Sequence, residues 1–289
     1  MKKSAVIAFL TLFLLGATAV YQYSKFYDGR LHLIFCDVGQ GDAIFIRTPK
    51  GKNILIDAGP GDKVLSCLSN HTPFWERKIS LAILTHPHND HLAGFIQVLK
   101  RYKISVFGME KLENKTQGYK RLMQDINNNE IKINYLFTGD SFKTEDGFKI
   151  RIMAPDESFL VKTSPNNIIG ENKEFSSLIT LISYGSFQAI LTGDSQVGEL
   201  KEAVEKQNLS SSIEIFQIPH HGSKTGVDRE VLQNIEPKIA VISVGKDNRY
   251  GHPTSYVLNL LKDLKIKIFR TDKQGDIEII SDKNSWTVQ

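Results

Sequence analysis

The sequence predicts an α/β (α+β) protein built as a four-layer αββα sandwich, with two facing mixed sheets in the middle and helices on both outer faces. From Leu31 onward, short runs rich in Val, Ile and Phe alternate with stretches of helical periodicity. The first runs follow one another through Gly-containing turns, as in a meander, whereas the later runs alternate with helices. Because the sequence has no internal repeat and no low-complexity tract, we expect residues 26–289 to form one domain.

Strands are predicted where β-branched and aromatic residues gather in short runs. In chain order these runs are Leu31–Cys36, Ala43–Arg47, Asn53–Asp57, Leu81–Leu84, Ile104–Phe107, Ile131–Tyr135, Phe148–Met153, Leu178–Ser183, Phe187–Leu191, Ile213–Ile218, Ile239–Ser243, Lys267–Arg270 and Asp276–Ile280. The predicted helices are Leu92–Tyr102, Tyr119–Asn128, Gln196–Gln207, Asp228–Ile235 and Ser255–Leu264. The long polar stretch Asp156–Glu174 is expected to be a surface loop near the functional site.

Residues 1–25 differ from the rest of the chain. Lys2 and Lys3 precede an almost uncharged apolar run, Ser4–Val20, which ends in Ala17-Thr18-Ala19. This pattern is typical of a secretory signal, and its length is at the lower limit for crossing a hydrocarbon core of about 30 Å. We therefore expect either a cleaved signal peptide or an uncleaved membrane anchor. Since the two Lys stay on the inner side, the body is expected to be extracytoplasmic, either secreted or anchored.

Composition sets broad limits on the function. With 41% hydrophobic and 24% charged residues the chain is globular, which excludes wholesale disorder. A solvated Lys-rich surface explains the net charge of +4 as well as a nucleic-acid partner does. Cys36 and Cys67 could pair in an oxidising compartment or stay separate as buried thiols, and their spacing is not that of a zinc knuckle.

Metal-binding residue types are densest in His86-Pro87-His88-Asn89-Asp90-His91. This segment joins a predicted strand to a predicted helix, so its side chains crowd into one turn. Imidazole nitrogens and carboxylates are ligands that zinc prefers and that manganese and iron accept. The spacing can aim two side chains at one metal and two at a neighbour, and paired metals stabilise the attacking and leaving oxygens of a displacement. The segment therefore predicts a divalent-metal site.

The pattern His86-x-His88-x-Asp90-His91 resembles the complete HxHxDH signature of the metallo-β-lactamase superfamily. Segments with the other features of that superfamily occur in its order: Asn53–Gly59, Leu191–Asp194, Pro219–Ser223 and Tyr250–Pro253. Singly these segments are weak signals, because an Asp after a strand is usually a turn or cap residue. Together they imply the metallo-β-lactamase sandwich and a metal-dependent hydrolase with one or two zinc ions, or manganese.

The resemblance also implies roles for single residues. His86 and His88 would hold one metal, Asp90, His91 and one of His220 and His221 would hold the other, and Asp194 would lie between the metals. Adjacent residues on an extended strand point in opposite directions, so only one of His220 and His221 is expected to be a ligand. The other, or His252, would contact the substrate or protonate the leaving oxygen, which makes Asp90, His220 and His252 the predicted catalytic residues. Asp57 would orient the ligands from behind.

Within the superfamily, the chain is most similar to the extracellular hydrolase domain of the competence protein ComEC and its stand-alone relatives. The matching segments include Asp37–Ala43, Val241–Gly245, Asn248–Pro253 and Arg270–Asp272, within residues 31–280. This likeness implies an extracytoplasmic phosphodiesterase or nuclease with a phosphodiester-containing substrate, DNA among the candidates. The alternatives are a wall-polymer or phosphorylcholine esterase, a β-lactamase or lactonase, and a non-catalytic metal-binding module of the same fold.

Two segments leave questions that the sequence does not answer. No histidine lies between His91 and Asp194, where many dinuclear members have one, so the His86/His88 side is expected to have fewer protein ligands. ComEC relatives often have Asp where this chain has His88. The segment Gly39-Gln40-Gly41-Asp42 is either a tight hairpin turn or a loop that lines the mouth of the site and meets substrate phosphates through backbone N–H groups.

Overall fold

The structure is a computed structural model that describes residues 2–169, 176–207 and 213–289. Within these ranges the strands form two large sheets. The first has the order β17-β16-β1-β2-β3-β5-β7-β8 and the second the order β15-β14-β13-β12-β11-β10-β9, while β4 and β6 form a separate pair. Both large sheets are mixed: β3, β5, β7 and β8 run parallel in the first, and β12 to β15 in the second.

The strands of the first large sheet and the small pair begin and end as follows: β1 Leu31–Phe35, β2 Ile44–Arg47, β3 Asn53–Ile56, β4 Lys78–Ile79, β5 Leu81–Leu84, β6 Lys103–Ile104, β7 Val106–Met109, β8 Lys132–Tyr135, β16 Ile277–Ser281 and β17 Trp286–Val288. Those of the second are β9 Ser141–Lys143, β10 Lys149–Ala154, β11 Ile179–Tyr184, β12 Phe187–Leu191, β13 Ile215–Gln217, β14 Ile239–Ile242 and β15 Lys267–Arg270. The helices are α1 Lys2–Phe26, α2 Lys63–His71, α3 Asn89–Val98, α4 Gln117–Asn128, α5 Glu157–Thr163, α6 Val197–Gln207, α7 Arg229–Ile235, α8 Ser255–Asp263 and α9 Thr271–Gln274, with a short 3-10 turn η1 at His220–Gly222.

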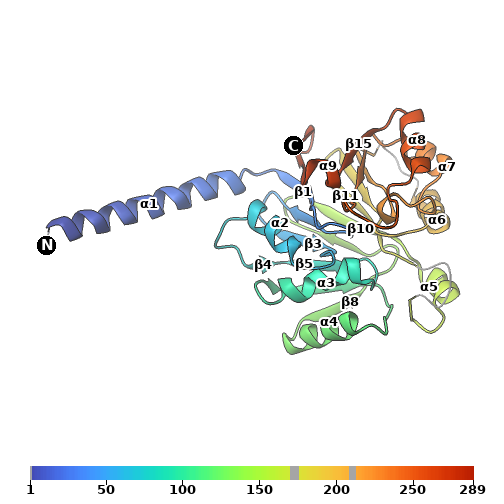
Figure 1. Cartoon of the computed structure of the whole chain (residues 1–289), viewed down its shortest axis with the longest axis horizontal. Helices are drawn as coiled ribbons and strands as arrows, with labels where there is room; N and C mark the ends of the chain where they lie inside the picture. Colours follow the sequence, from blue (N-terminus) through green and yellow to red (C-terminus); the bar gives the residue numbers. More distant parts are fainter. Residues whose placement is uncertain (1, 170–175, 208–212) are drawn as a thin grey trace.

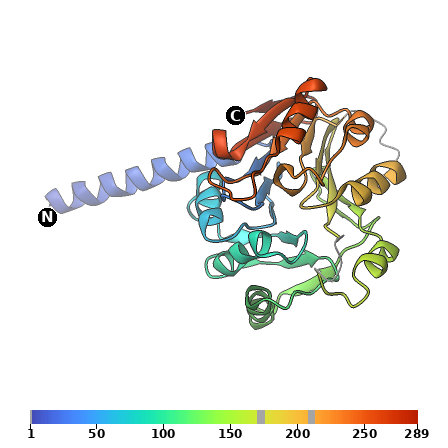
Figure 2. The ribbon, with the colours of Figure 1, turned by 45° about the vertical axis from the view of Figure 1, so that its right-hand side comes forward.

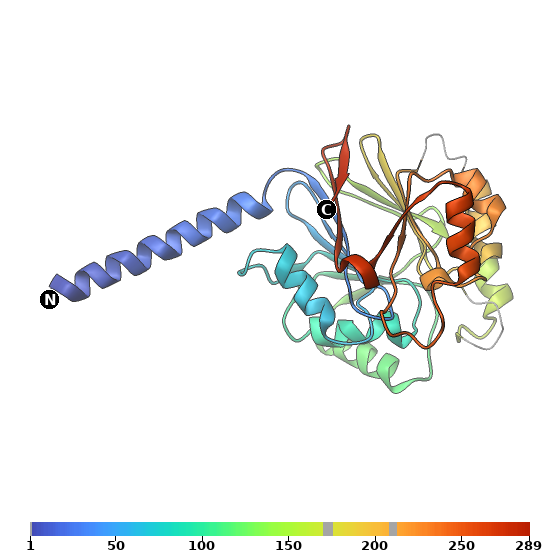
Figure 3. The same cartoon turned by 45° about the horizontal axis from the view of Figure 1, so that its top comes forward.

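Three hydrophobic clusters hold the layers together. One lies between the sheets and joins Leu33 and Ile56 of the first sheet to Ile150 and Val241 of the second. Another packs α2, α3 and α4 on the outer face of the first sheet, and a third packs α6, α7 and α8 on the outer face of the second. Figure 3 shows the two groups of helices on opposite sides of the sheets. The predicted four-layer αββα fold is confirmed.

Helix α1 stands apart from the layers. It projects from the body as one continuous rod (Figures 1 and 2), and its apolar side chains are exposed along its whole length. Among the described residues, Lys3–Phe26 is the stretch long and apolar enough to cross a membrane. The predicted apolar leader is therefore one helix that runs a few residues beyond the Ser4–Val20 run.

Several predictions of local structure were wrong or incomplete. Helix α2 was missed although Val64, Cys67 and Leu68 are buried on one face, because nine residues make a short periodic pattern. Part of the polar stretch Asp156–Glu174 is helix α5, which begins where the Asp156 side chain accepts a hydrogen bond from the N–H of Phe159; residues 170–174 lie outside the described ranges. The short elements β4, β9, β17 and α9 had no signal of their own, since neighbouring strands determine such short pieces.

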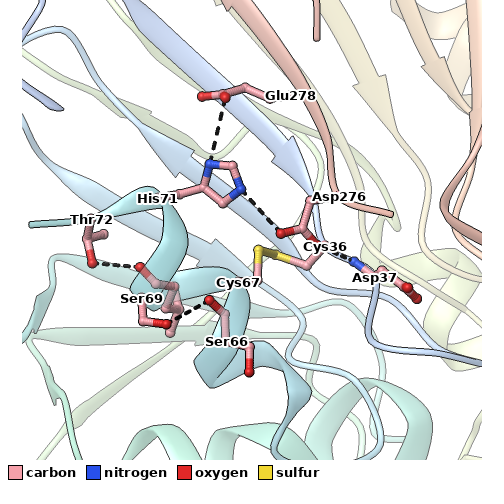
Figure 4. Close-up of a disulfide and its surroundings, with 10 residues drawn as sticks. Cys36, Asp37, Ser66, Cys67, Ser69, His71, Thr72, Asp276 and Glu278 are labelled. Atoms are coloured by element: carbon pink, nitrogen blue, oxygen red, sulfur yellow. Dashed lines mark hydrogen bonds and ion pairs between the residues drawn. A yellow bond between two sulfur atoms is a disulfide. The ribbon is translucent and has the colours of Figure 1, made fainter. Parts of the chain in front are cut away.

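The two cysteines pair in the structure. Cys36 follows β1 and Cys67 lies on α2, with their Cα atoms 5.7 Å apart. The alternative of two separate thiols is therefore wrong. Figure 4 shows the disulfide beside His71, whose imidazole lies 3.2 Å from Asp276 and 3.7 Å from Glu278. The bond fastens the start of the loop Cys36–Ala43 to the helix that covers it.

Candidate metal centre

The predicted metal motif lies where β5 passes into α3. His86 and His88 lie in the connecting turn, and His88 is the N-cap residue of α3. Asp90 and His91 fall in the first helical turn, because α3 begins at Asn89, three residues before the predicted Leu92. The helix approaches the end of β3 so closely that a Cβ on Gly94 would lie 1.8 Å from the carbonyl oxygen of Ala58. Gly94 thus permits the packing that brings Asp90 and His91 to the sheet edge.

Asp57 fixes this turn from below. Its carboxylate accepts hydrogen bonds from the N–H of Thr85 at 2.8 Å and from the Thr85 hydroxyl at 2.6 Å. It also accepts a bond of 2.7 Å from Nδ1 of His91. Since Nδ1 of His91 donates to Asp57, its Nε2 is left to face the centre of the site. The resemblance predicted that Asp57 orients the ligands from behind, and the contact with His91 agrees with that position, while the role itself stays a prediction.

A first cluster of candidate ligands is made by Asp90, His91, Asp194 and His221, whose ligand atoms all lie within 4.8 Å of one another. Oδ1 of Asp194, which lies in the turn after β12, is 3.4 Å from Nε2 of His91 and 3.6 Å from Nε2 of His221. Nε2 of His221 is also 3.5 Å from Oδ2 of Asp90. These atoms come from three separate segments and converge on one point.

The first cluster fits a metal ion better than it fits hydrogen bonding. Nε2 of His91, Oδ1 of Asp194 and Nε2 of His221 are buried, and none has a hydrogen-bond partner among the described residues. Buried polar atoms are normally hydrogen-bonded, so three that face each other without a hydrogen bond are arranged as ligands of a cation would be, although protonated histidines could also pair with Asp194 here. Ligands held tetrahedrally at about 2 Å from a zinc ion lie roughly 3.3 Å from each other, close to the separations seen here.

A second cluster shares Asp194. His86, His88 and Asp194 offer ligand atoms within 4.8 Å of one another. Nε2 of His86 lies 3.0 Å from Nδ1 of His88 and 3.7 Å from Oδ2 of Asp194. Nε2 of His220 lies 3.7 Å from the same oxygen. His220 thus lies near the second cluster, although its ligand atoms are not within 4.8 Å of all those of the other three residues.

The prediction that His220 and His221 lie on an extended strand was wrong. Both occupy the turn η1 with left-handed backbone angles, φ +51° and +56°. In this turn the two imidazoles face different oxygens of Asp194, so both lie at the site rather than on opposite sides of a strand. The argument that only one of them can be a ligand consequently loses its premise.

Charge explains why the first cluster would attract a cation. Burial lowers the pKa of His91, but Asp194 and Asp57 outweigh it and raise this pKa well above its usual range. At His221 burial likewise lowers the pKa, and Asp194 and Asp42 raise it well above normal. Burial and the nearby His91 lower the pKa of His86, so His86 is a neutral imidazole and its Nε2 a candidate ligand atom. The carboxylates demand positive charge, from protons or from metal ions.

Residues that the sequence did not single out hold His221 in place. Nδ1 of His221 donates to the backbone oxygen of Ser243 at 3.0 Å and lies 3.5 Å from Oδ1 of the buried Asp42. The Gln217 side chain donates to Asp42 at 2.8 Å and accepts from the N–H of Thr192 at 2.9 Å. Asp42 belongs to the Gly39–Asp42 segment that resembled the ComEC group, and that likeness was the one available signal for its role.

The Gly39–Asp42 segment is not a tight hairpin turn. It lies within an eight-residue connection between β1 and β2, and the N–H of Asp42 donates to the carbonyl of Asp90 at 3.3 Å. A Cβ on Gly41 would lie 2.3 Å from that carbonyl oxygen. Gln40 lines an open cleft of about 590 Å³ together with Asn89, Asp90, Arg249 and Tyr250. The segment therefore lies at the mouth of the site, while its contact with phosphates stays a prediction.

His252 lies at the rim rather than inside the clusters. Its ring is 5.8 Å from that of His220 and stacks at 5.9 Å with that of the exposed Tyr250. Two hydrogen bonds with the side chain of Asn248 hold its backbone. Burial, and after it the nearby His220, lower its pKa. His252 thus lies beside the clusters, next to the residues Asn248 and Tyr250 that line the cleft, while its contact with substrate stays a prediction.

Comparison with known proteins agrees with this geometry. Residues 36–121 match the family model of the Metallo-beta-lactamase superfamily. ComE operon protein 3 of Bacillus subtilis is 29% identical over 276 residues, which cover 87% of this chain and 33% of that protein. Recombination protein 2 of Haemophilus influenzae is 26% identical over 247 residues, which cover 84% of this chain and 28% of that protein. The chain is thus similar to competence- and recombination-related proteins and has the metallo-β-lactamase fold. It spans about one third of the length of these relatives.

Solved structures show the same fold at low identity. The metallo-beta-lactamase fold protein YhfI from Bacillus subtilis has a TM-score of 0.57 and 11% identity, covering 86% of this chain and 99% of YhfI. Zn(2+)-bound PqqB from Methylobacterium extorquens has a TM-score of 0.52 and 13% identity, covering 80% of this chain and 85% of PqqB. The PqqB structure contains Zn²⁺. In this chain, the two clusters that share Asp194 are among the groups of described residues that could hold a metal ion.

Proposed function

We propose that this protein is an extracytoplasmic, metal-dependent phosphodiesterase, with nuclease activity as its first specific form. The observation that carries the proposal is the pair of ligand clusters on either side of Asp194, one of them with three buried atoms that make no hydrogen bond among the described residues. Two adjacent clusters that share a carboxylate suit in-line displacement at phosphorus, in which an attacking and a leaving oxygen both need stabilisation. The competence- and recombination-related relatives favour DNA as the phosphodiester.

The donor sets favour zinc, with manganese as the alternative. They mix imidazole nitrogens with carboxylate oxygens and contain no thiolate, because both cysteines are in the disulfide. When bound, such ions make water nucleophilic near neutral pH and polarise the phosphoryl oxygen. In this proposal Asp90, His91 and His221 hold one ion, His86, His88 and His220 hold the other, and Asp194 serves both.

The remaining side chains orient these ligands and move protons. Asp57 fixes the ring of His91, and the Ser243 carbonyl with Asp42 fixes that of His221. His252 would donate a proton to the leaving oxygen from the rim, where its ring lies 5.8 Å from that of His220. Asn248, Arg249 and Tyr250 line the cleft in which the substrate would lie.

Two features support a location outside the cytoplasm. Helix α1 is apolar and unburied and begins with basic residues, as expected of a membrane anchor or signal segment. The Cys36–Cys67 disulfide is the state expected in an oxidising compartment. Residues 26–289 would then form the extracytoplasmic hydrolase domain.

Metal content and hydrolysis of bis-p-nitrophenyl phosphate and of DNA by the full chain in detergent test this proposal. Asp194→Asn should lose both bound metal and activity. Asp263→Asn is the matched control, because Asp263 is exposed on α8 far along the chain from the motif and pairs only with Arg229 among the described residues. A wild-type protein that retains metal yet hydrolyses neither substrate would refute the phosphodiesterase. Release of choline from wall polymer instead of nucleotides from DNA would point to the esterase alternative.

A further inference from the structure

We propose that the turn Thr72–Arg77, here called the aromatic turn, inserts Phe74 and Trp75 into the membrane interface beside the end of α1. The proposal rests on the proposed extracytoplasmic location, and of the two forms given there for α1 it takes the uncleaved membrane anchor. It assigns a second membrane contact to the body of the protein, in addition to the helix. The partner is the lipid–water interface of a bilayer.

The aromatic turn holds two large side chains in water. Phe74 is 59% exposed and Trp75 is 41% exposed, and their rings meet edge to face at 4.8 Å. Outside α1, the described residues include four other exposed large hydrophobic side chains, and none of these is adjacent in sequence to another. Single exposed hydrophobics are ordinary on a protein surface, whereas adjacent aromatics commonly mark an interaction site.

The backbone presents these side chains in a fixed direction. Thr72 and Pro73 are buried, and the Thr72 hydroxyl donates to the carbonyl of Leu68 at 2.6 Å. The N–H of Glu76 donates to the carbonyl of Pro73 at 2.9 Å, which closes the turn. The Glu76 side chain accepts from the N–H of Lys78. Phe74 and Trp75 therefore stand on an anchored turn with their side chains exposed.

The position of α1 indicates which partner this surface meets. Lys25 and Phe26 at the end of α1 line the same hollow of about 320 Å³ as Asn70 and His71 at the end of α2. The aromatic turn follows directly after His71. In Figures 1 and 3 the connection between α2 and β4 lies on the side of the body from which α1 projects. A bilayer that contains α1 would thus reach the aromatic turn.

The end of α1 next to the body has the composition of a membrane interface. Lys3–Phe26 is 24 residues long, or about 36 Å at 1.5 Å per residue, enough to cross a hydrocarbon core of about 30 Å. Tyr21 and Tyr23 are exposed near its end, and the ring of Tyr23 stacks on that of Tyr27 at 4.8 Å. Trp and Tyr concentrate at this depth in membrane proteins. Phe74 and Trp75 extend the same belt onto the body.

Basic side chains surround the aromatic turn. Arg77 at the end of the turn and Lys78 directly after it are exposed, and Lys78 lies opposite Lys103 in the β4–β6 ladder. Lys25 and Arg30 lie on the other side, near the end of α1. Basic residues beside interfacial aromatics favour a bilayer that contains anionic lipids. The surface therefore fits a membrane better than it fits an apolar protein partner.

Tryptophan fluorescence tests this contact directly, because the chain has two tryptophans and the other, Trp286, packs against the core between the sheets. The full chain is reconstituted into vesicles of phosphatidylcholine and phosphatidylglycerol, with and without lipids brominated near the glycerol end of the acyl chains. The wild type is compared with Trp75→Phe, a substitution at an exposed site that leaves the fold intact. We expect the tryptophan emission of the wild type in vesicles to lie at a shorter wavelength than that of the unfolded chain in detergent-free buffer. We also expect the brominated lipids to quench the wild-type emission. Trp75→Phe should lose that quenching.

Vesicle flotation separates the two ways in which the proposal can fail. A chain that floats with the vesicles while Trp75→Phe and the wild type are quenched equally would overturn the contact of the aromatic turn and leave the anchor standing. A chain that does not float would overturn the membrane role of α1, and the contact of the turn with it. Neither result bears on metal binding or hydrolysis, which are measured on the same protein.

Discussion

Removal of the Cys36–Cys67 disulfide should lower the free energy of unfolding by about 4 kcal/mol. The perturbation is the double substitution Cys36→Ala and Cys67→Ala, which leaves no free thiol. The bond closes a segment with a sequence separation of 31, which contains β2, β3 and most of α2. Chain-entropy reasoning gives about 3.7 kcal/mol for a loop of this size. The two buried sulfur atoms that are lost add a small packing term.

Urea unfolding of the full chain in detergent, followed by tryptophan fluorescence, measures this effect. The wild type in a reducing agent should approach the double variant, and the variant itself should not respond to the reducing agent. This comparison separates the cross-link from the packing term, because reduction keeps both sulfur atoms. A loss below about 1 kcal/mol under both treatments would refute the loop-closure reasoning and imply that the unfolded chain keeps this segment ordered.

Four further predictions concern the site and the fold. Asp57→Asn should weaken metal binding by roughly 10- to 100-fold, since it removes the carboxylate that orients His91; competition with a chelator measures this, with Asp263→Asn as control. His220→Gln should empty the His86/His88 side while the Asp90/His91 side keeps its ion, and His221→Gln should do the reverse, as elemental analysis would show; equal losses in both variants would contradict the division of ligands. Burial lowers the pKa of His71, but hydrogen bonds to Asp276 and Glu278 raise it from 6.5 to about 9. The stability that His71 adds relative to His71→Gln, on the order of 3 kcal/mol, should be complete below pH 6.5 and disappear as the pH rises through about 9; a difference that does not change with pH would refute it. Gly94→Ala should cost about 3 kcal/mol because its Cβ meets the Ala58 carbonyl, whereas Gly198→Ala on α6, with open space around it, should be neutral or stabilising.

The fold could be predicted from the sequence because its main elements carry local signals. Strands such as Phe187–Leu191 are runs of apolar residues, and helices such as α8 show an amphipathic period. The elements that were missed are short, and their pairing partners define them. β4 and β6 pair over two residues each, and no local pattern distinguishes such strands from a loop.

The metal motif could be predicted for a similar reason, since His86 to His91 are close in sequence and therefore close in space. The residues Ser243 and Gln217, which support His221 and Asp42, could not be predicted. Ser243 acts through its backbone oxygen and Gln217 through hydrogen bonds to other segments, and neither contact leaves a mark on residue type or spacing. Whether His220 or His221 faces the site depends on the sign of φ in one turn. The assumed strand geometry implied a negative φ, whereas both residues have a positive φ.

The left-handed turn η1 changes how the missing histidine should be interpreted. From the sequence, the lack of a histidine between His91 and Asp194 implied a loose or empty His86/His88 side. A strand at residues 220–221 would have turned one imidazole away, and that implication would have held. With both residues at positive φ, His220 lies 3.7 Å from Oδ2 of Asp194 and His221 lies 3.6 Å from Oδ1, so one dipeptide brings an imidazole to each oxygen. In the proposed function this backbone conformation would supply the ligand that the sequence lacks between His91 and Asp194. Gly222, where a Cβ would lie 2.5 Å from the side chain of Pro253, allows the turn to pack against the segment that carries His252.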